Sequence, residues 1–314
     1  YTQEELFQKV DFDEMASTPL TRSTEQGWVA MIQHYFLGAV IPQQGAKPTL
    51  YTYEPSQGRY AIGAILPAVT VAAGETGDLM MQLYLGPKDQ DRMEQMAPGL
   101  ELTVDYGWLT FLAQPIFWVL NQIQDVVGNW GFSIILLTML IKLVFFKLSE
   151  TSYRSMAQMR KLTPRLTSLK ERYGDDRQKM NEAMMRIYRE EKVNPMGGCL
   201  PILVQIPVFI ALYWVLLESV EIRQAPFILW IQDLSAMDPY YILPLLMGGS
   251  MLIQQRLNPA PIDPIQQKVM MVLPIVFTVF FAFFPAGLVL YWVVNNAISI
   301  AQQYYITRKI EAAG

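Results

Sequence analysis

Four long stretches without a charged residue limit what this chain can fold into. They are Val126–Ile141, Val193–Leu217, Pro239–Gln255 and Val269–Thr307, with 16, 25, 17 and 39 residues. A helix needs about 20 residues to cross the hydrocarbon core of a bilayer. The last stretch is too long for one crossing, and Pro285 with its neighbouring Gly287 signals a turn near its middle. We therefore predict five transmembrane helices, at about 130–148, 200–217, 240–256, 269–284 and 286–306.

The charged residues are distributed unevenly enough to predict an orientation. Residues 1–129 carry 6 basic and 15 acidic side chains, whereas residues 149–199 carry 11 basic and 7 acidic ones. With five spans, one side of the membrane holds 149–199 and the two short C-terminal segments, with 15 basic residues in all. The other side holds the 218–239 loop, with Arg223 as its basic residue. Because Lys and Arg concentrate in short cytoplasmic loops, we expect residues 1–129 outside and the C-terminus inside the cytoplasm.

Residues 1–104 have the short apolar or alternating runs of a β domain. Turn signals such as Gln57-Gly58 and Gly74-Glu75 separate these runs. The predicted strands are Trp28–Phe36, Leu50–Tyr53, Arg59–Ala64, Val69–Val71 and Leu79–Leu85. The chain begins at Tyr1 without a signal peptide, although a domain outside the membrane needs a targeting signal. We therefore expect the chain to be part of a longer protein.

The segment 105–126 allows two interpretations. Tyr106–Gln124 is uncharged for 19 residues and could form a sixth span. However, Gln114, Asn121 and Asp125 fall near one helical face, and few residues separate this segment from the next predicted helix. We predict an amphipathic helix that lies on the outer surface of the membrane that the chain spans.

Residues 149–199 are predicted to form a helical hairpin on the cytoplasmic side. Apolar residues recur every three or four positions from Tyr153 to Tyr173 and again from Met180 to Ile187, and Gly174-Asp175-Asp176 lies between the two halves. The basic residues form either a solvated face that also sets topology, or a docking surface for an RNA-containing or anionic partner or for lipid headgroups. The interspersed acidic residues argue against a dedicated nucleic-acid-binding arm.

Lys142 is the charged residue that lies away from the ends of a predicted span. It is six residues before Leu148, about 9 Å at 1.5 Å per residue, so its side chain could reach the cytoplasmic interface by snorkelling. The alternative is a cavity that holds water and opens to the cytoplasm. Polar residues in the predicted spans favour the cavity, because they exceed what helix packing needs: Thr138, Gln205, Trp292, Asn295, Asn296 and Ser299.

The residue types exclude several kinds of catalytic site. One Cys and one His rule out an internal disulfide and a Cys/His zinc cluster, and we expect no cofactor or metal. Gly248-Gly249-Ser250 could suggest a nucleophile, but no His lies in a predicted span to activate it. His34 in the β domain is expected to be structural, and Cys199 a small residue at a helix start. A solute transporter or channel remains the alternative, although no internal repeat or midspan carboxylate supports it.

Five stretches resemble a known family: VGNWGFSIILLT (127–138), YRSMAQMRKLTP (153–164), EKVNPMGGCLPILVQIP (191–207), RQAPFILWIQDLSAMDPYYILP (223–244) and FPAGLVLYWVVNN (284–296). In these residues the chain resembles the bacterial branch of the YidC/Oxa/Alb family of membrane protein insertases. The resemblance implies a membrane α-helical fold with a five-transmembrane-helix insertase core and a cytoplasmic helical hairpin. Part of a periplasmic β-sandwich domain precedes this core, and the location is the bacterial inner membrane. The family's first transmembrane helix and the start of that domain are absent from this sequence.

The same resemblance implies roles for particular residues and partners. The family has a hydrophilic groove that carries a basic residue, usually Arg, at the position of Lys142 here; a Lys keeps the charge but loses the bidentate fork. The groove's polar lining is similar to Thr138, Gln205, Trp292 and Asn295, and the apolar slide for substrates falls on Pro207, Ile210, Phe280 and Phe281. The implied partners are nascent membrane proteins, the Sec translocon, the ribosome, targeting factors and membrane lipids. The implied activity is insertion of hydrophobic segments without covalent chemistry.

Overall fold

The computed structural model describes residues 1–174, 176–191, 193, 200–258 and 264–312. The chain forms two compact units. The first, the β unit, consists of Tyr1–Asp105 together with Glu218–Glu221, and the second, the helical unit, consists of the remaining described residues. Cys199 and the Asn194-Pro195 and Gly197-Gly198 pairs, which were expected to end the hairpin, lie outside the described residues.

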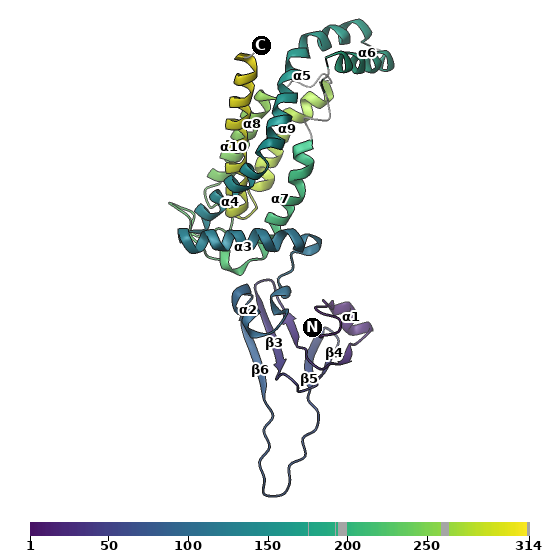
Figure 1. The fold of residues 1–314 in the computed structure, drawn as a ribbon, viewed down its shortest axis with the longest axis vertical. Helices are drawn as coiled ribbons and strands as arrows, with labels where there is room; N and C mark the ends of the chain where they lie inside the picture. The colour runs from purple at the N-terminus through teal and green to yellow at the C-terminus, as the bar shows by residue number, and fades with distance from the viewer. Residues whose placement is uncertain (175, 192, 194–199, 259–263, 313–314) are drawn as a thin grey trace. The chain divides into compact units, whose positions relative to one another are not determined.

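The β unit contains two antiparallel three-stranded sheets (Figure 1). One sheet has the order β1-β4-β5 and the other β2-β3-β6, and β5 also contacts β2 and β3. Alternate residues of the central strand β3, such as Leu37, Ala39 and Ile41, are buried, as a half-buried strand requires. The elements are α1 (Phe12–Ser17), β1 (Thr21–Ser23), β2 (Val29–Ile32), β3 (Phe36–Pro42), β4 (Thr49–Ser56), β5 (Arg59–Ile65), β6 (Met81–Pro87) and α2 (Gln90–Met96).

Some of the predicted strands were wrong. The run Trp28–Phe36 is two strands, because the chain turns after Ile32 and β3 begins at Phe36. Val69–Val71 forms no strand and lies in an exposed loop. The prediction missed β1 and most of β3, in which Gly38 interrupts the apolar run. A Cβ at Gly38 would lie 2.9 Å from the Leu85 side chain, so the close approach of β6 explains the glycine.

The helical unit contains the predicted helices, in part with different bounds. The predicted interfacial segment is helical, as α3 (Thr110–Val127), and Gly128 ends it with a positive φ of 69°. Figure 1 shows α3 lying crosswise at one end of this unit and α5 with α6 at the other. The elements are α4 (Trp130–Val144), α5 (Phe146–Tyr173), α6 (Arg177–Glu190), α7 (Leu200–Glu218), α8 (Ile242–Leu257), α9 (Pro264–Phe281) and α10 (Ala286–Ala312).

The first predicted span does not continue straight to residue 148. Helix α4 ends at Val144, and α5 starts at Phe146 with a bend of 68° between the two helices. By length and composition this bent pair could cross a membrane, and within the described residues no single helix passes that test. The hairpin prediction holds for its described part: Leu162 and Leu166 of α5 are buried with Val193, and Met184 and other residues of α6 pack against them.

The loop between α7 and α8 is built around a buried carboxylate. Asp238 is 1% exposed, and its two oxygens accept hydrogen bonds from Trp230 Nε1 and from the backbone N–H groups of Tyr240 and Leu243. The neighbouring segment caps the start of α10, because the Ala236 carbonyl accepts from the Ala286 N–H at 2.7 Å. This arrangement fixes the turn that was predicted between the last two helices.

Candidate functional site

A cavity of about 440 Å³ lies among six helices of the helical unit. Twelve of its 18 described lining residues carry a polar side-chain group, although the helices that supply it, apart from α5, are apolar over most of their length. The polar lining residues are Lys142, Ser149, Ser152, Tyr153, Gln205, Gln254, Asn258, Tyr291, Trp292, Asn295, Asn296 and Ser299. Among the described lining residues Lys142 is the one cation, and no carboxylate is present. The cavity can therefore hold water or an anionic group.

Lys142 points into the helical unit and not toward the end of its helix. The side chain is buried, with 6% exposed, and its Nζ donates a hydrogen bond to Ser299 Oγ of α10 at 2.8 Å. None of the ion pairs between described residues includes Lys142. Snorkelling to the interface is thus not what the structure shows. A buried charge without a counter-charge is unfavourable unless water or a ligand solvates it.

The other predicted polar residues take two different places. Gln205 of α7 donates to Asn295 Oδ1 of α10 at 2.7 Å, and both line the cavity. Trp292 also lines it, and its indole Nε1 is buried without a hydrogen-bond partner among the described residues. Thr138 is buried but is not among the lining residues, and its hydroxyl donates to the Ile134 carbonyl of its own helix at 2.6 Å.

The four predicted slide residues lie outside the cavity lining, on α7 and α9. Pro207 and Ile210 are partly exposed, and the Phe280 ring is 53% exposed. Phe281 is buried against Trp292, with 5.8 Å between the ring centroids. An exposed apolar surface therefore lies on the same helices that line the cavity, with an aromatic cluster behind it.

The contribution of α5 to the cavity was not predicted from the sequence. Ser149, Ser152, Tyr153 and Met156 line the cavity. The bend at Phe145 brings these residues over Lys142, and the sequence around Phe145 carries no Pro or Gly that would have indicated it. The apolar periodicity of α5 was therefore assigned to hairpin packing alone.

The remaining candidate positions have structural roles. Ser250 accepts a hydrogen bond from Asn296 Nδ2 at 2.9 Å and so joins α8 to α10. His34 lies in the β unit, with its Nδ1 3.8 Å from Glu218 Oε1. Among the described residues, no group of three His, Cys, Asp or Glu side chains could hold a metal ion.

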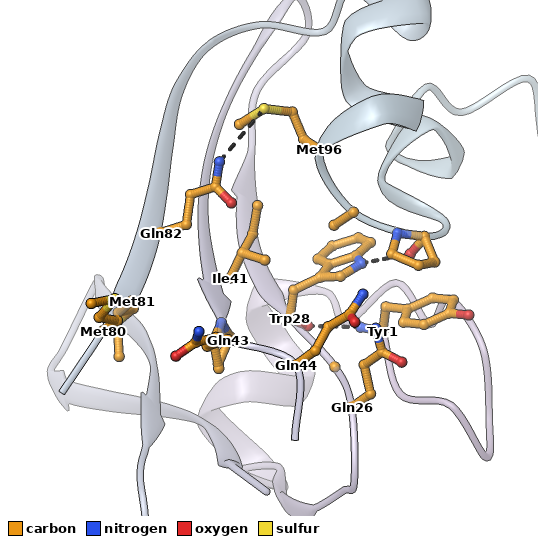
Figure 2. Close-up of a pocket in the computed structure, with 14 residues that line it drawn as sticks. Tyr1, Gln26, Trp28, Ile41, Gln43, Gln44, Met80, Met81, Gln82 and Met96 are labelled. Atoms are coloured by element: carbon orange, nitrogen blue, oxygen red, sulfur yellow. Dashed lines mark hydrogen bonds between the residues drawn. The ribbon is translucent and has the colours of Figure 1, made fainter. Parts of the chain in front are cut away.

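The β unit has a second cavity, of about 590 Å³ (Figure 2). Its described lining combines amides, thioethers, aromatic rings and aliphatic residues, with no charged side chain. Figure 2 shows Gln82 reaching toward Met96 on one wall, and the stacked Tyr1 and Trp28 rings on another. Among the described lining residues, this cavity therefore has no cationic side chain comparable to Lys142.

Comparison with known proteins identifies the class. Residues 122–313 match the family model described as "60Kd inner membrane protein", and residues 1–119 match the model described as "YidC periplasmic domain". A β domain of the periplasmic type is therefore followed by the helical core of an inner membrane protein. The chain belongs to the 60Kd inner membrane protein family.

Curated relatives cover the whole chain. Proteins named "Membrane protein insertase YidC" from Nitrosococcus oceani, Alkalilimnicola ehrlichii and Pseudomonas fluorescens are 64%, 61% and 60% identical to it over 100%, 99% and 100% of its length. The chain spans 57%, 56% and 56% of these relatives. A crystal structure titled as an active YidC insertase with its first transmembrane domain resolved is similar with a TM-score of 0.56 and 20% identity. That similarity covers 91% of this chain and 79% of the other, and it concerns the fold.

Proposed function

We propose that the protein is a membrane protein insertase and chaperone. It moves hydrophobic segments of newly made proteins from the cytoplasm into the inner membrane through the cavity around Lys142, alone or with the Sec translocon. The observation that carries the proposal is a buried cation without a carboxylate partner among the described residues, in a cavity to which the apolar helices α4, α7 and α10 contribute polar side chains. The proposal is also supported by the relatives named "Membrane protein insertase YidC", one of which is 64% identical to this chain.

The cavity would act by solvation and geometry, without covalent chemistry. A polar segment that crosses hydrocarbon loses water from its charges and its backbone, which is unfavourable by several kcal/mol per unsatisfied group. Polar groups such as Gln205 and Asn295 replace part of that water, and Lys142 attracts an acidic segment. The preference of the site for acidic segments should depend on positive charge more than on paired hydrogen bonds, because a Lys ammonium is a point charge without the two-pronged geometry of Arg.

Other parts of the chain would guide the substrate and anchor the protein. The apolar surface at Pro207, Ile210 and Phe280 would lead the hydrophobic segment toward lipid, with Phe281 supporting the Phe280 ring from behind. The α5–α6 hairpin, on the cytoplasmic side, would receive nascent chains, ribosomes or targeting factors.

Helix α3 would lie at the periplasmic interface of the inner membrane. Its buried side includes Phe117 and Leu120, whereas three aromatic rings near or on the helix stay exposed: Trp108, Phe111 and Trp118. Exposed aromatic rings are typical of membrane interfaces.

The test is insertion into proteoliposomes that contain the purified full-length protein. The substrates are two single-span proteins that differ only in whether the translocated tail carries acidic or neutral residues. We expect Lys142→Ala to impair insertion of the acidic-tail substrate by about tenfold, which is the effect of one charge-assisted contact, and Lys142→Arg to preserve it.

Equal insertion of the acidic-tail substrate by Lys142→Ala and by the wild type would overturn the proposal. The same vesicles test the transporter alternative: a flux of small solutes that depends on the protein, without insertion of either substrate, would favour a transporter or channel.

A further inference from the structure

The hydroxyl of Ser299 joins α4 to α10 at the charge of the cavity. Ser299 is on α10 and is 3% exposed. Its Oγ accepts from Lys142 Nζ of α4 at 2.8 Å and donates to the Asn295 carbonyl of its own helix at 2.7 Å. A lysine ammonium in a predicted span is thus held by a neutral partner.

The hydrogen-bond inventory of this hydroxyl fixes its role. A serine hydroxyl has one proton and two lone pairs. The Asn295 carbonyl takes the proton, so both lone pairs of Ser299 Oγ face away from that carbonyl, and one of them accepts from Lys142. A hydroxyl in this state is an acceptor of defined direction. It can hold an ammonium without neutralising it, whereas a carboxylate at the same place would cancel the charge.

We propose that Ser299 is a positioning residue that holds the Lys142 ammonium inside the cavity and so sets the preference of the site for acidic segments. This inference rests on the proposed function. An ammonium has three N–H donors, and the bond to Ser299 uses one of them. The other two are available to an arriving carboxylate, and the fixed position removes the need to order the flexible lysine stem when the substrate arrives.

The absence of the hydroxyl should release the lysine. In Ser299→Ala the ammonium loses its acceptor, and the side chain can extend toward the aqueous end of α4, as a long cationic side chain near a helix end does. Ser299→Thr keeps a hydroxyl that can also donate to the carbonyl four residues earlier, so it should retain the contact. Ser250→Ala is the matched control, because this serine joins α8 to α10 through Asn296 and is not among the lining residues.

The experiment measures acylation of Lys142 by a water-soluble amine-reactive ester. The full-length protein is reconstituted in vesicles, and the peptide that contains Lys142 is followed by mass spectrometry. We expect acylation about tenfold faster in Ser299→Ala than in the wild type, since a hydrogen bond to a charged group is lost. The acylation rates of Ser299→Thr and Ser250→Ala should stay within about twofold of the wild-type rate, because neither change removes the hydrogen bond to Lys142.

The insertion assay then links position to specificity. We expect Ser299→Ala to lower the ratio of acidic-tail to neutral-tail insertion, and Ser299→Thr to restore it. Unchanged acylation in Ser299→Ala overturns the positioning role, and faster acylation with an unchanged ratio overturns its link to specificity. A failure of the proposed function is distinguishable, because Lys142→Ala would then insert both substrates normally whatever Ser299→Ala does to acylation.

Discussion

Glu221 should make the stability of the β unit depend on pH. The residue follows α7 in a short 3-10 turn, Val220–Ile222, and belongs to the β unit. Its Oε1 accepts from the Gln90 N–H at 3.2 Å, whereas its Oε2 is buried without a hydrogen-bond partner among the described residues. Burial, the largest cause, together with the nearby Asp89 and Asp91, raises the pKa of Glu221 from 4.5 to about 7 against the lowering effect of its backbone hydrogen bonds. The native state therefore disfavours the carboxylate.

The sign and size of the effect follow from these values. Below about pH 4.5 Glu221 is protonated in both the folded and the unfolded state and carries no penalty. Between about pH 4.5 and 7 the unfolded state releases its proton first, so the free energy of unfolding falls as the pH rises, and the loss is complete above pH 7. The full difference corresponds to about 3 kcal/mol, an upper limit because the site can relax or admit water. Glu221→Gln removes the ionisation and keeps the shape.

Hydrogen–deuterium exchange of the amides in β3 and β6 measures this free energy. We expect Glu221→Gln to match the wild type at about pH 4, below both pKa values, and to be more stable by about 2–3 kcal/mol at pH 8. Intrinsic exchange rates and other titrating groups largely cancel when the two proteins are compared at the same pH. Glu75→Gln, at an exposed position, is the control and should show no such difference. An equal difference between variant and wild type at both pH values would refute the reasoning.

Three further substitutions test the packing. Asp238→Asn replaces an acceptor oxygen by a donor where backbone N–H groups point at the carboxylate, and should lower the thermal midpoint in detergent through a loss of about 2 kcal/mol; an unchanged midpoint would contradict the role of the buried carboxylate. Gly131→Ala places a Cβ against the Phe227 ring and should destabilise the protein by about 1–3 kcal/mol in the same assay; an unchanged midpoint would show that the ring moves aside without loss. Lys88→Met removes a buried cation 3.7 Å from Glu218 Oε2 and should destabilise the β unit by about 1–3 kcal/mol in hydrogen exchange. Adding Glu218→Gln should recover most of that loss, and purely additive effects would show that the two residues do not interact.

The sequence predicts the helices of the core better than the strands of the β unit. An uncharged window of 16 to 39 residues is a strong signal, because an unpaired charge in an apolar environment is so unfavourable. Strand signals are weaker. Gly38 interrupts the apolar pattern of β3, and the cause is the close approach of Leu85 from β6, a tertiary contact that the local sequence does not reveal. The exposed run at Val69–Val71 resembles a strand in composition but has no neighbouring strand to pair with among the described residues.

The residues of the candidate site that could be predicted are those whose residue type alone is unusual in an apolar window. Lys142 stands out because it is a charge in an apolar window, and Gln205 and Asn295 stand out as amides there. Thr138 was also predicted, but a threonine in a helix can satisfy its hydroxyl on its own backbone, and this one does. Ser149 and Tyr153 could not be assigned to the cavity, because their place depends on the bend at Phe145. Local sequence does not encode that bend by Pro or Gly.

A charge exchange between the protein and its substrate tests the central claim most directly. The assay compares insertion of two substrates that differ only in an acidic or a basic translocated tail, in proteoliposomes with wild-type protein or Lys142→Glu. A cavity that acts through the charge at position 142 predicts that the wild type favours the acidic tail and that Lys142→Glu reverses the preference. The same preference in both proteins would contradict the account, since the buried charge would then take no part in insertion.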